Sequence, residues 1–586
     1  MLKLFKNFER KDYLIIFIVF FFVVFSVFLE LKIPEYMSEI TRLVQTESST
    51  MNEILTSGSY MLLCAVSSLV CTVIVGYLTS LLSARFSRNI RRKIFSKVED
   101  FGIAEIKKFQ TSSLITRTTN DVSQIEMLLA MGLQMLIKAP VTAIWALTKI
   151  LGKSGELSVI TAIGVVIIVV TNLIIISIVT PRFSKIQKLT DKINGVTREN
   201  ITGIQVVHAF NAEDFLEKRF DDVNSDLTGI HLKITRTFAL MDPVMNFVMH
   251  FQLLSIYVVG AFLIIQSSMM DKITMFSNMV VFSSYGVQII ISFLLLTFIF
   301  MVAPRAKVSA KRINEILDEE ISIKNGTFNG DTKEIGTVEF KNVSFKYPDA
   351  DEYILKNISF KANKGDVVAF IGSTGSGKST LINLVPRLYD ATDGEVLVDG
   401  VNVCSYDIKA LNNKIGYIPQ TAVMFTGSVY DNVTYGDNGD KKPSLDKVKE
   451  VIKIAQAKDF VEKMDKKYKS HIARGGTNIS GGQKQRLSIA RAIARDPEIY
   501  IFDDSFSALD YQTDYTLRQE LKKYTKDATS LIVAQRIGTI MNADKILVLD
   551  KGECVGFGTH KELLKNCSVY KEIALSQLSE EELENA

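Results

Sequence analysis

The chain has 586 residues, which is too long for a single hydrophobic core, so two or more domains are expected. Hydrophobic residues make up 47% of the sequence and charged residues 23%, a mixture that predicts a membrane half joined to a soluble half. The net charge of +4 is small for this length and argues against a nucleic-acid partner, and the five cysteines are too scattered for a metal site or a disulfide framework.

The first twelve residues form a short basic, amphipathic segment suited to a membrane surface. Six apolar runs follow, each with roughly the 20 residues needed to cross about 30 Å of hydrocarbon. The first run is too long for a signal-peptide core and lacks a small-residue cleavage site, which favours a membrane helix. The six predicted membrane helices cover residues 13–33, 58–84, 127–151, 157–180, 238–267 and 274–303.

Basic residues are concentrated in two connections between these helices, 85–126 and 181–237. The other three connections, 34–57, 152–156 and 268–273, carry few lysines or arginines. Because basic loops stay in the cytoplasm, we expect both termini and both basic connections to be cytoplasmic, in a multi-pass protein of the plasma membrane. Apolar residues recur at helical spacing through the basic connections, so the membrane helices should extend well beyond the bilayer.

The composition changes near residue 320, where the predicted membrane domain of residues 1–320 ends. A polar linker is expected over 321–336, and short strands alternating with helical stretches follow it. This alternation predicts an α/β domain over 337–577, with residues 578–586 left as an acidic tail.

A glycine-rich stretch with the pattern G-x-x-x-x-G-K-[ST] follows the apolar run Val367–Ile371 and leads into a predicted helix. In this context the glycines let backbone N–H groups point at phosphates, and the helix N-terminus adds its positive dipole end. Lys378 brings a positive charge to the β- and γ-phosphates, and the Ser379 hydroxyl can bind Mg²⁺. The pattern therefore predicts binding of a nucleoside triphosphate by Gly372, Ser373, Thr374, Gly375, Ser376, Gly377, Lys378, Ser379 and Thr380.

Three further features suit a nucleotide site. Tyr347 ends a predicted strand before the loop, where its ring can stack on adenine; the alternative is an ordinary strand-end aromatic. The apolar run Ile499–Phe502 leads to Asp503, a carboxylate that can hold Mg²⁺ through water. A capped helix start that presents N–H groups to a phosphate is predicted at Ser480, Gly481, Gly482 and Gln483.

With these motifs in place, the sequence resembles the ATP-binding cassette (ABC) exporters along essentially its whole length. The resemblance implies a membrane protein in which an all-α six-helix transmembrane domain is followed by an α/β P-loop NTPase domain. It implies ATP and Mg²⁺ as cofactors, an adenine-stacking role for Tyr347, and a Mg²⁺ site at Ser379, Gln420 and Asp503. It also implies that two chains close head to tail, so that Ser480–Gln483 and Asp510 of one chain complete the ATP site of the other.

Two positions depart from the family pattern: the catalytic glutamate is Asp504 here, and the switch histidine is Gln535. A general base must reach the attacking water at about 2.6–3.2 Å. Removing one methylene withdraws the carboxylate by roughly 1.5 Å, and a misplacement of about 1 Å can cost about 100-fold in rate. An amide can donate a hydrogen bond to the γ-phosphate but cannot carry the positive charge of an imidazolium.

Either change alone could be harmless drift, but both together fit a heterodimeric exporter in which one site binds ATP and hydrolyses it poorly. The partner would be a second half-transporter that carries the catalytic Glu and the switch His, and whose site this chain's Ser480–Gln483 would complete. A homodimeric slow ATPase and a regulatory ATP-binding subunit are the alternatives. The residues of Thr111–Asp121 and His208–Asp214 predict polar breaks between long helices, and the resemblance places the coupling helices there.

Polar and soft side chains inside the predicted membrane helices are candidates for cargo binding. An adaptable cavity lined by methionines and aromatics would suit amphipathic compounds, so a multidrug-type exporter that removes them from the cytoplasm or inner leaflet is the leading hypothesis. Lipid, peptide and porphyrin are alternative cargoes, membrane lipid is an expected partner, and helix packing is the alternative role for these side chains. The cargo candidates are Lys138, Asp242, Met245, Met249, Phe282 and Tyr285.

Overall fold

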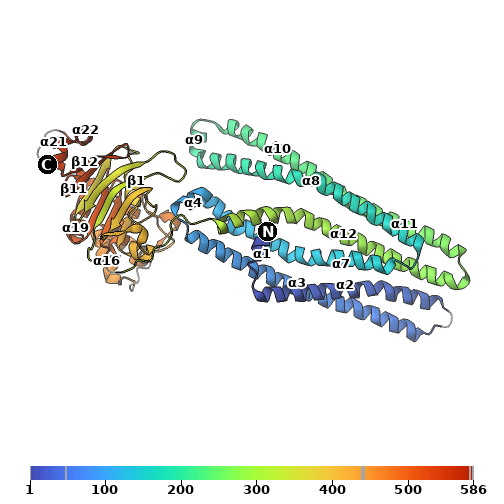
Figure 1. Cartoon of the computed structure of the whole chain (residues 1–586). Helices are drawn as coiled ribbons and strands as arrows, with labels where there is room; N and C mark the ends of the chain where they lie inside the picture. Colours follow the sequence, from blue (N-terminus) through green and yellow to red (C-terminus); the bar gives the residue numbers. More distant parts are fainter. Residues whose placement is uncertain (1, 47–48, 331, 437–441, 580–582, 584–586) are drawn as a thin grey trace. The chain divides into compact units, whose positions relative to one another are not determined.

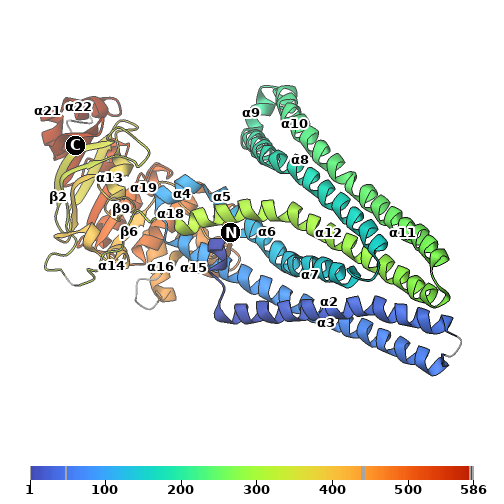
Figure 2. The same ribbon diagram turned by 45° about the vertical axis from the view of Figure 1, so that its right-hand side comes forward.

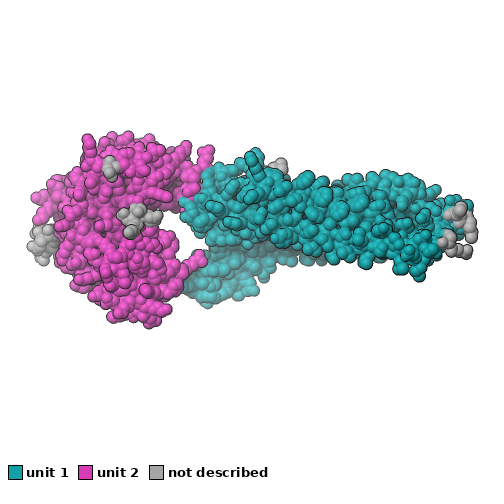
Figure 3. All heavy atoms as spheres, turned by 90° about the horizontal axis from the view of Figure 1, so that it is seen from below, with its two compact units in different colours: residues 1–99, 110–319 teal, residues 100–109, 320–586 magenta. Residues whose placement is uncertain are grey.

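The computed structural model of the chain describes residues 2–46, 49–330, 332–436, 442–579 and 583. The chain divides into two compact units, which Figure 3 colours separately. Unit 1 comprises residues 1–99 and 110–319, and unit 2 comprises residues 100–109 and 320–586. Most of the predicted acidic tail, residues 580–582 and 584–586, lies outside the described residues.

Unit 1 is built from long helices (Figure 1). Among the described residues, six helices are long and apolar enough to cross a membrane, and the six predicted segments coincide with them, two segments ending one residue beyond their helix. A helix of 48 residues is roughly 72 Å long at 1.5 Å per residue, more than twice the hydrocarbon thickness, so these helices reach beyond a bilayer as expected. The six are Arg10–Gln45, Met51–Glu99, Thr111–Ile150, Gly155–Thr202, Glu213–Gln266 and Asp271–Asp318.

Two of these spans are composite. The third runs through two π-helical turns, η1 and η2, and the fifth consists of α10 and α11, which meet at Leu240. The elements of unit 1 are α1 (Leu2–Phe5), α2 (Arg10–Gln45), α3 (Met51–Glu99), α5 (Thr111–Thr116), η1 (Arg117–Asp121), α6 (Val122–Met127), η2 (Leu128–Gly132), α7 (Leu133–Ile150), α8 (Gly155–Thr202), α9 (Ile204–Ala209), α10 (Glu213–Ala239), α11 (Met241–Gln266) and α12 (Met269–Asp318).

The helices of unit 1 pack through buried aromatic and aliphatic side chains. One cluster joins α2, α7, α8, α11 and α12 and includes Val27, Phe282 and Tyr285, and the Tyr285 hydroxyl donates to the backbone oxygen of Leu31 at 2.7 Å. A second cluster, around Ile175 and Met245, packs α8, α10 and α11 against α12. Figures 1 and 2 both show α8 and α10 running side by side and separating from α12 toward α9.

The polar break predicted at Thr111–Asp121 is wrong, because this segment is helical and begins the third long helix. Its role as a coupling helix stays a prediction. Its hydroxyls fit a helix because those of Thr116 and Thr118 bond to backbone oxygens four residues earlier. The separate short helix is α4 (Ile103–Phe109), about ten residues earlier in the chain, and it belongs to unit 2.

Helix α4 packs inside unit 2. Ile103 and Ala104 pack against the hydrophobic core of this unit. The Glu105 carboxylate accepts a hydrogen bond from the backbone N–H of Ser322 at 3.1 Å. The second predicted coupling segment, His208–Asp214, does contain a turn, because α9 ends at Ala209 and α10 begins at Glu213.

Unit 2 contains a six-stranded sheet in the order β12-β11-β3-β10-β9-β6, parallel except for the edge strand β12. A four-stranded antiparallel sheet, β2-β1-β4-β5, packs with it around a core that includes Phe340, Phe360 and Phe370. The strands are β1 (Val338–Phe345), β2 (Leu355–Ala362), β3 (Val367–Gly372), β4 (Asp393–Val398), β5 (Val401–Asn402), β6 (Ile415–Ile418), β7 (Gly427–Ser428), β8 (His471–Ile472), β9 (Ile499–Asp503), β10 (Thr529–Val533), β11 (Lys545–Asp550) and β12 (Glu553–Gly558).

The predicted α/β domain is thus present, and its central strands β3 and β9 are buried along nearly their whole length, as is typical of parallel strands covered on both faces. The carboxyl ends of β3, β9 and β10 lie at one edge of the sheet, where ligands bind in open α/β folds. Besides α4, the helices of unit 2 are α13 (Lys378–Asn383), α14 (Ile408–Asn413), α15 (Val429–Val433), α16 (Leu445–Ile454), α17 (Lys458–Lys463), α18 (Gly481–Ile493), α19 (Tyr511–Tyr524), α20 (Ile537–Ile540), α21 (His560–Asn566) and α22 (Ser568–Leu575), with short 3-10 turns at η3 (Val403–Ser405), η4 (Lys467–Lys469) and η5 (Arg474–Gly476).

Candidate nucleotide-binding site

The phosphate loop connects β3 to α13, as the sequence predicted. Gly377 has φ of 98°, and a Cβ there would lie 2.8 Å from a methyl carbon of Leu355, so only glycine fits this turn. The Lys378 ammonium donates to the backbone oxygens of Gly372 and Ser373, each at 2.8 Å. Burial lowers the pKa of Lys378, and the carboxylates of Asp504 and Asp503 oppose that shift. The ammonium is therefore held inside the loop that would cradle the phosphates.

A hydroxyl and a carboxylate meet where Mg²⁺ would bind. The Ser379 hydroxyl, in the first turn of α13, donates to Oδ1 of Asp503 at 2.7 Å, and Asp503 ends the buried strand β9. Burial raises the pKa of Asp503, and the hydrogen bond from Ser379 opposes the rise. No cluster of three metal-ligating side chains occurs among the described residues, but Mg²⁺ at a phosphate site needs only one or two protein oxygens, with phosphates and water as the other ligands. This donor pair fits the predicted ion.

One oxygen of the Asp504 carboxylate accepts hydrogen bonds from two side-chain amides. Its Oδ2 accepts a hydrogen bond from Nε2 of Gln535 at 2.8 Å and another from Nε2 of Gln420 at 3.3 Å. The backbone N–H of Asp504 donates to the oxygen of Val533 at the end of β10, at 3.1 Å. The three predicted positions thus converge on a single oxygen atom.

The backbone and surroundings of Asp504 explain its position. Its φ is 46°, in the left-handed region that aspartate tolerates better than longer side chains, and the residue is 8% exposed. Burial raises the pKa of Asp504, while the hydrogen bond from Gln420 and the charge of Lys378 lower it. The carboxylate is therefore short, buried and already hydrogen-bonded.

Tyr347 lies just beyond β1 and next to the loop. Its hydroxyl is 2.9 Å from the hydroxyl of Thr380, which places the ring beside the first turn of α13. The ammonium of Lys107, on α4, lies 5.1 Å from the centroid of this ring and 5.9 Å from that of Tyr389. Lys107 was missed by the sequence reasoning, because nothing in the sequence connects a lysine 240 positions earlier to this tyrosine.

The predicted glycine turn begins α18 as expected. Ser480 is its N-cap: the Ser480 hydroxyl accepts from the N–H of Gln483 at 3.3 Å, and Oε1 of Gln483 accepts from the N–H of Ser480 at 2.9 Å. A Cβ at Gly481 would meet no atom within 4 Å, so the backbone there is open to approach. Asp510 caps α19 by accepting from the N–H of Thr513 at 2.9 Å, a bond that holds its pKa below the ordinary value.

The six cargo candidates lie in different surroundings and are not brought together. The Lys138 ammonium is 2.7 Å from Oε1 of Glu30, an intramembrane partner in the same chain that the prediction did not name. Met245, Phe282 and Tyr285 are buried in helix packing, with Met249 beside the cluster that contains Met245, and Asp242 is exposed in the first turn of α11. A cargo role for these residues remains a prediction.

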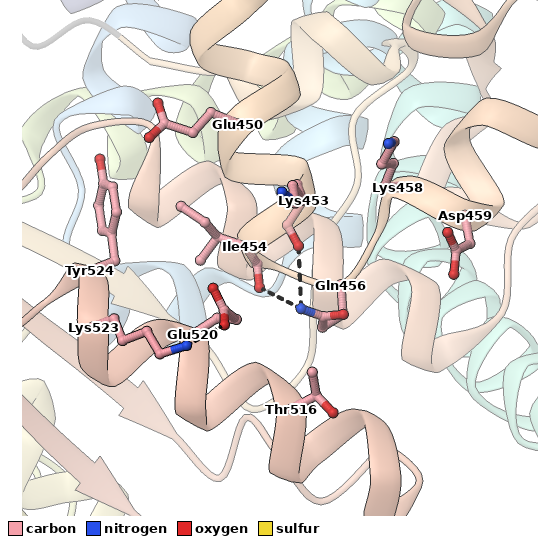
Figure 4. A pocket seen from close by; sticks show the side chains of 10 residues that line it. All are labelled: Glu450, Lys453, Ile454, Gln456, Lys458, Asp459, Thr516, Glu520, Lys523 and Tyr524. Atoms are coloured by element: carbon pink, nitrogen blue, oxygen red, sulfur yellow. Dashed lines mark hydrogen bonds and ion pairs between the residues drawn. The ribbon is translucent and has the colours of Figure 1, made fainter.

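A separate hollow of about 680 Å³ lies between α16, α17 and α19 (Figure 4). None of the predicted site residues lines it. Its three acidic and three basic side chains balance each other, and the Gln456 amide points to the backbone oxygens of Lys453 and Ile454, so the lining favours no class of charged ligand. The nucleotide site is therefore the chemically organised part of unit 2.

Comparison with known protein families agrees with this geometry. Residues 16–285 match the ABC transporter transmembrane region, and residues 355–507 match the ABC transporter family. The first match covers five predicted membrane helices and the start of the sixth. The second includes the phosphate loop, Gln420, the glycine turn and both carboxylates at the end of β9, but stops short of Gln535.

Full-length relatives are similar along most of the chain. An uncharacterized ABC transporter ATP-binding protein of Mycobacterium tuberculosis is 38% identical over 89% of this chain and 88% of its own length. A Staphylococcus aureus protein provisionally named a multidrug export ATP-binding/permease protein is 32% identical over 85% of each chain. The structure of a bacterial Atm1-family ABC exporter with ATP bound has a TM-score of 0.80 at 22% identity, covering 95% of this chain and 98% of that one. The chain thus belongs to the ABC transporter family, as an exporter half-transporter whose six-helix transmembrane domain is fused to an ABC ATPase domain.

Proposed function

We propose that this chain is one half of a heterodimeric ABC exporter and contributes the weaker of its two ATP sites. Its own phosphate loop would hold MgATP through Lys378, Ser379 and Asp503 and hydrolyse it slowly. A partner half-transporter carrying the catalytic Glu and switch His would perform most of the turnover. The partner's site would be completed by this chain's Ser480, Gly481, Gly482, Gln483 and Asp510.

The observation that carries the proposal is the double hydrogen bond on Oδ2 of Asp504. A general base needs an unoccupied oxygen facing the attacking water at about 2.6–3.2 Å. Here the Gln535 and Gln420 amides both bond to Oδ2, which fixes the direction of the carboxylate and leaves only Oδ1 to accept the proton of a water. The side chain is also one methylene shorter than the family's glutamate. A short carboxylate that is held in one direction cannot advance toward the water, so slow hydrolysis is expected.

The switch position adds to this effect. The Gln535 amide donates to Asp504 at 2.8 Å, so one of its two N–H groups is committed to the carboxylate. The remaining N–H can contact a γ-phosphate, but without the charge that a protonated histidine supplies to the developing negative charge in the transition state. Such a site favours nucleotide retention over turnover.

The orientation and cargo are part of the same proposal. The basic connections support a plasma-membrane protein with both termini and the ATP site in the cytoplasm. Amphipathic compounds are the proposed cargo, since a relative 32% identical to this chain is provisionally named a multidrug export protein. ATP binding would close the paired ATPase domains and turn the cavity outward, and hydrolysis at the partner's site would reset it.

The direct test compares the chain alone with a complex containing its partner. The chain alone is expected to bind ATP and turn it over slowly, and the paired complex to hydrolyse ATP rapidly. In that complex Lys378→Ala should slow turnover much less than the same change at the partner's phosphate-loop lysine. Equal effects of the two lysine substitutions, or rapid turnover by the chain alone, would refute the asymmetry.

A further inference from the structure

The loop that carries Gln535 is held by a side chain near the C-terminus. Nε2 of Gln577 donates to the backbone oxygen of Gln535 at 2.8 Å, and its Oε1 accepts from the backbone N–H of Ile537 at 2.8 Å. One amide therefore bonds to the backbone on both sides of Arg536. Gln577 also lines the cavity of about 560 Å³ that contains Asp504 and Gln535.

The two backbone groups that Gln577 engages have few other partners. Ile537 is the first residue of the four-residue helix α20, and the first N–H groups of a helix lack partners within it. A side-chain amide that bonds to both groups fixes the backbone between residues 535 and 537. The direction of the Gln535 side chain depends on that backbone, and with it the 2.8 Å bond to Asp504.

Packing holds Gln577 in this place. Its backbone N–H donates to the oxygen of Ala574 at 3.1 Å, so the residue continues from the end of α22. Ala574 and Tyr570, on the buried face of α22, are fully buried in the same cluster as Ile537 and Ile540. The C-terminal helix and the switch segment therefore share one core, and Gln577 connects their edges.

A second side chain holds the switch segment from its other side. Arg518, on α19, donates to the backbone oxygens of Gly538 at 2.9 Å and Thr539 at 3.4 Å while paired with Asp514. Arg518 thus fixes the segment after Ile537, and Gln577 fixes the segment before it. Of the two, Gln577 is the one whose bonds reach the switch residue itself.

We propose that Gln577 is a positioning residue for the switch: it aims the Gln535 amide at Asp504 and thereby helps this site to retain ATP. The retention part rests on the proposed function, whereas the positioning part does not. The segment around Gln577 then contributes to the geometry of the ATP site, although the match to the ABC transporter family over the ATPase domain ends at residue 507.

The test uses the full chain with its partner and five variants. Gln577→Ala removes both bonds, and Gln577→Glu keeps the acceptor for the Ile537 N–H but loses the donor. Ser576→Ala is the matched control, because within the part of the chain that the structure describes the Ser576 hydroxyl bonds only to the backbone oxygen of Ile573, in α22. Gln535→Ala, alone and combined with Gln577→Ala, shows whether Gln577 acts through the switch.

Hydrogen–deuterium exchange over residues 533–541 reports the positioning. Gln577→Ala is expected to speed exchange at the Ile537 amide about 3- to 10-fold, Gln577→Glu less, and Ser576→Ala not at all. Retained radiolabelled ATP reports the consequence: Gln577→Ala should shorten its lifetime about 3-fold, and should have no further effect when Gln535 is already alanine.

The outcomes distinguish the positioning role of Gln577 from the proposal that this ATP site is the weak one. Unchanged exchange in Gln577→Ala overturns the positioning role, whatever the lifetime of bound ATP. Faster exchange together with rapid ATP turnover in the unmodified chain supports the positioning role and overturns the weak-site proposal. An equal loss of retention in the presence and absence of the Gln535 side chain would make Gln577 merely structural and overturn its action through the switch.

Discussion

Restoring the family residues at two positions should activate this chain's own ATP site. In Asp504→Glu the carboxylate extends by one methylene, roughly 1.5 Å, toward the position of an attacking water. In Gln535→His the switch gains a group that can carry positive charge. In a complex whose partner cannot hydrolyse ATP, we expect the Asp504→Glu, Gln535→His double variant to turn over ATP about 100-fold faster than the unmodified chain.

The structure also predicts a cost for this gain. Asp504 has φ of 46° and its carboxylate accepts two amide hydrogen bonds, so a longer side chain must fit a left-handed backbone and shift those bonds. A penalty of about 1 kcal/mol corresponds to a fall of about 2–4 °C in the melting temperature of a domain of some 200 residues. A gain in turnover accompanied by a small loss of stability is the expected signature.

The assay is steady-state phosphate release from the purified complex, with thermal unfolding measured on the same samples. Asp407→Glu and Gln519→His make the same chemical changes outside the site, on the cap of α14 and on α19, and should leave turnover unchanged. Asp407→Glu lengthens an N-cap side chain, so it is a control for turnover only, whereas Gln519→His is the control for both quantities. If the double variant hydrolyses ATP no faster than the unmodified chain, the length and charge of these side chains do not limit the reaction.

Three further predictions concern other parts of the chain. Lys107→Ala removes the ammonium that lies over the Tyr347 ring, so an adenine that stacks on this ring no longer has to displace it. Because a cation–π contact contributes about 0.5–1 kcal/mol, labelled ATP should bind roughly 2- to 5-fold more tightly; weaker binding would mean that Lys107 is part of the ATP site. Burial raises the pKa of Asp503 above its ordinary value, and only the ionised carboxylate binds Mg²⁺. The Mg²⁺-dependent part of the ATP affinity should therefore be present at neutral pH and lost as the pH falls through that raised pKa. Asp503→Asn should abolish this pH dependence. Glu30→Gln or Lys138→Met leaves the other charge unpaired and should lower the melting temperature in detergent by several degrees. The double variant should recover most of that loss, whereas an equal loss in both single variants and the double variant would argue against the Glu30–Lys138 ion pair.

The sequence predicts well those parts of the site that are formed by residues close together in the chain. The phosphate loop, with its strand, glycines and helix, is specified by neighbours in sequence, and Ser480 caps α18 through Gln483, three residues away. Asp503 follows from one apolar strand. In each case local geometry is enough, so the pattern and the structure agree.

Features that depend on distant segments could not be read in the same way. Lys107 and Gln577 reach the site from segments that are distant in the sequence, through two contacts each, and such contacts leave no periodic or compositional signal. Glu30 lies within an apolar run, and nothing in the sequence names Lys138 as its partner. The error at Thr111–Asp121 has a different cause: hydroxyl side chains read as a break, but in a helix they bond back to the preceding turn.

The geometry at Asp504 also predicts that the two departures from the family pattern depend on each other. The Gln535 amide reaches Oδ2 at 2.8 Å because the aspartate is short, and a glutamate carboxylate displaced by roughly 1.5 Å would crowd that amide. Asp504→Glu alone should therefore recover little activity, and Gln535→His alone should leave a short carboxylate out of reach. Phosphate release from both single variants and the double variant gives the coupling directly. If the two single-variant effects on the rate of phosphate release multiply in the double variant, the two positions are independent. A gain confined to the double variant means that the Gln535 amide and the short Asp504 carboxylate depend on each other.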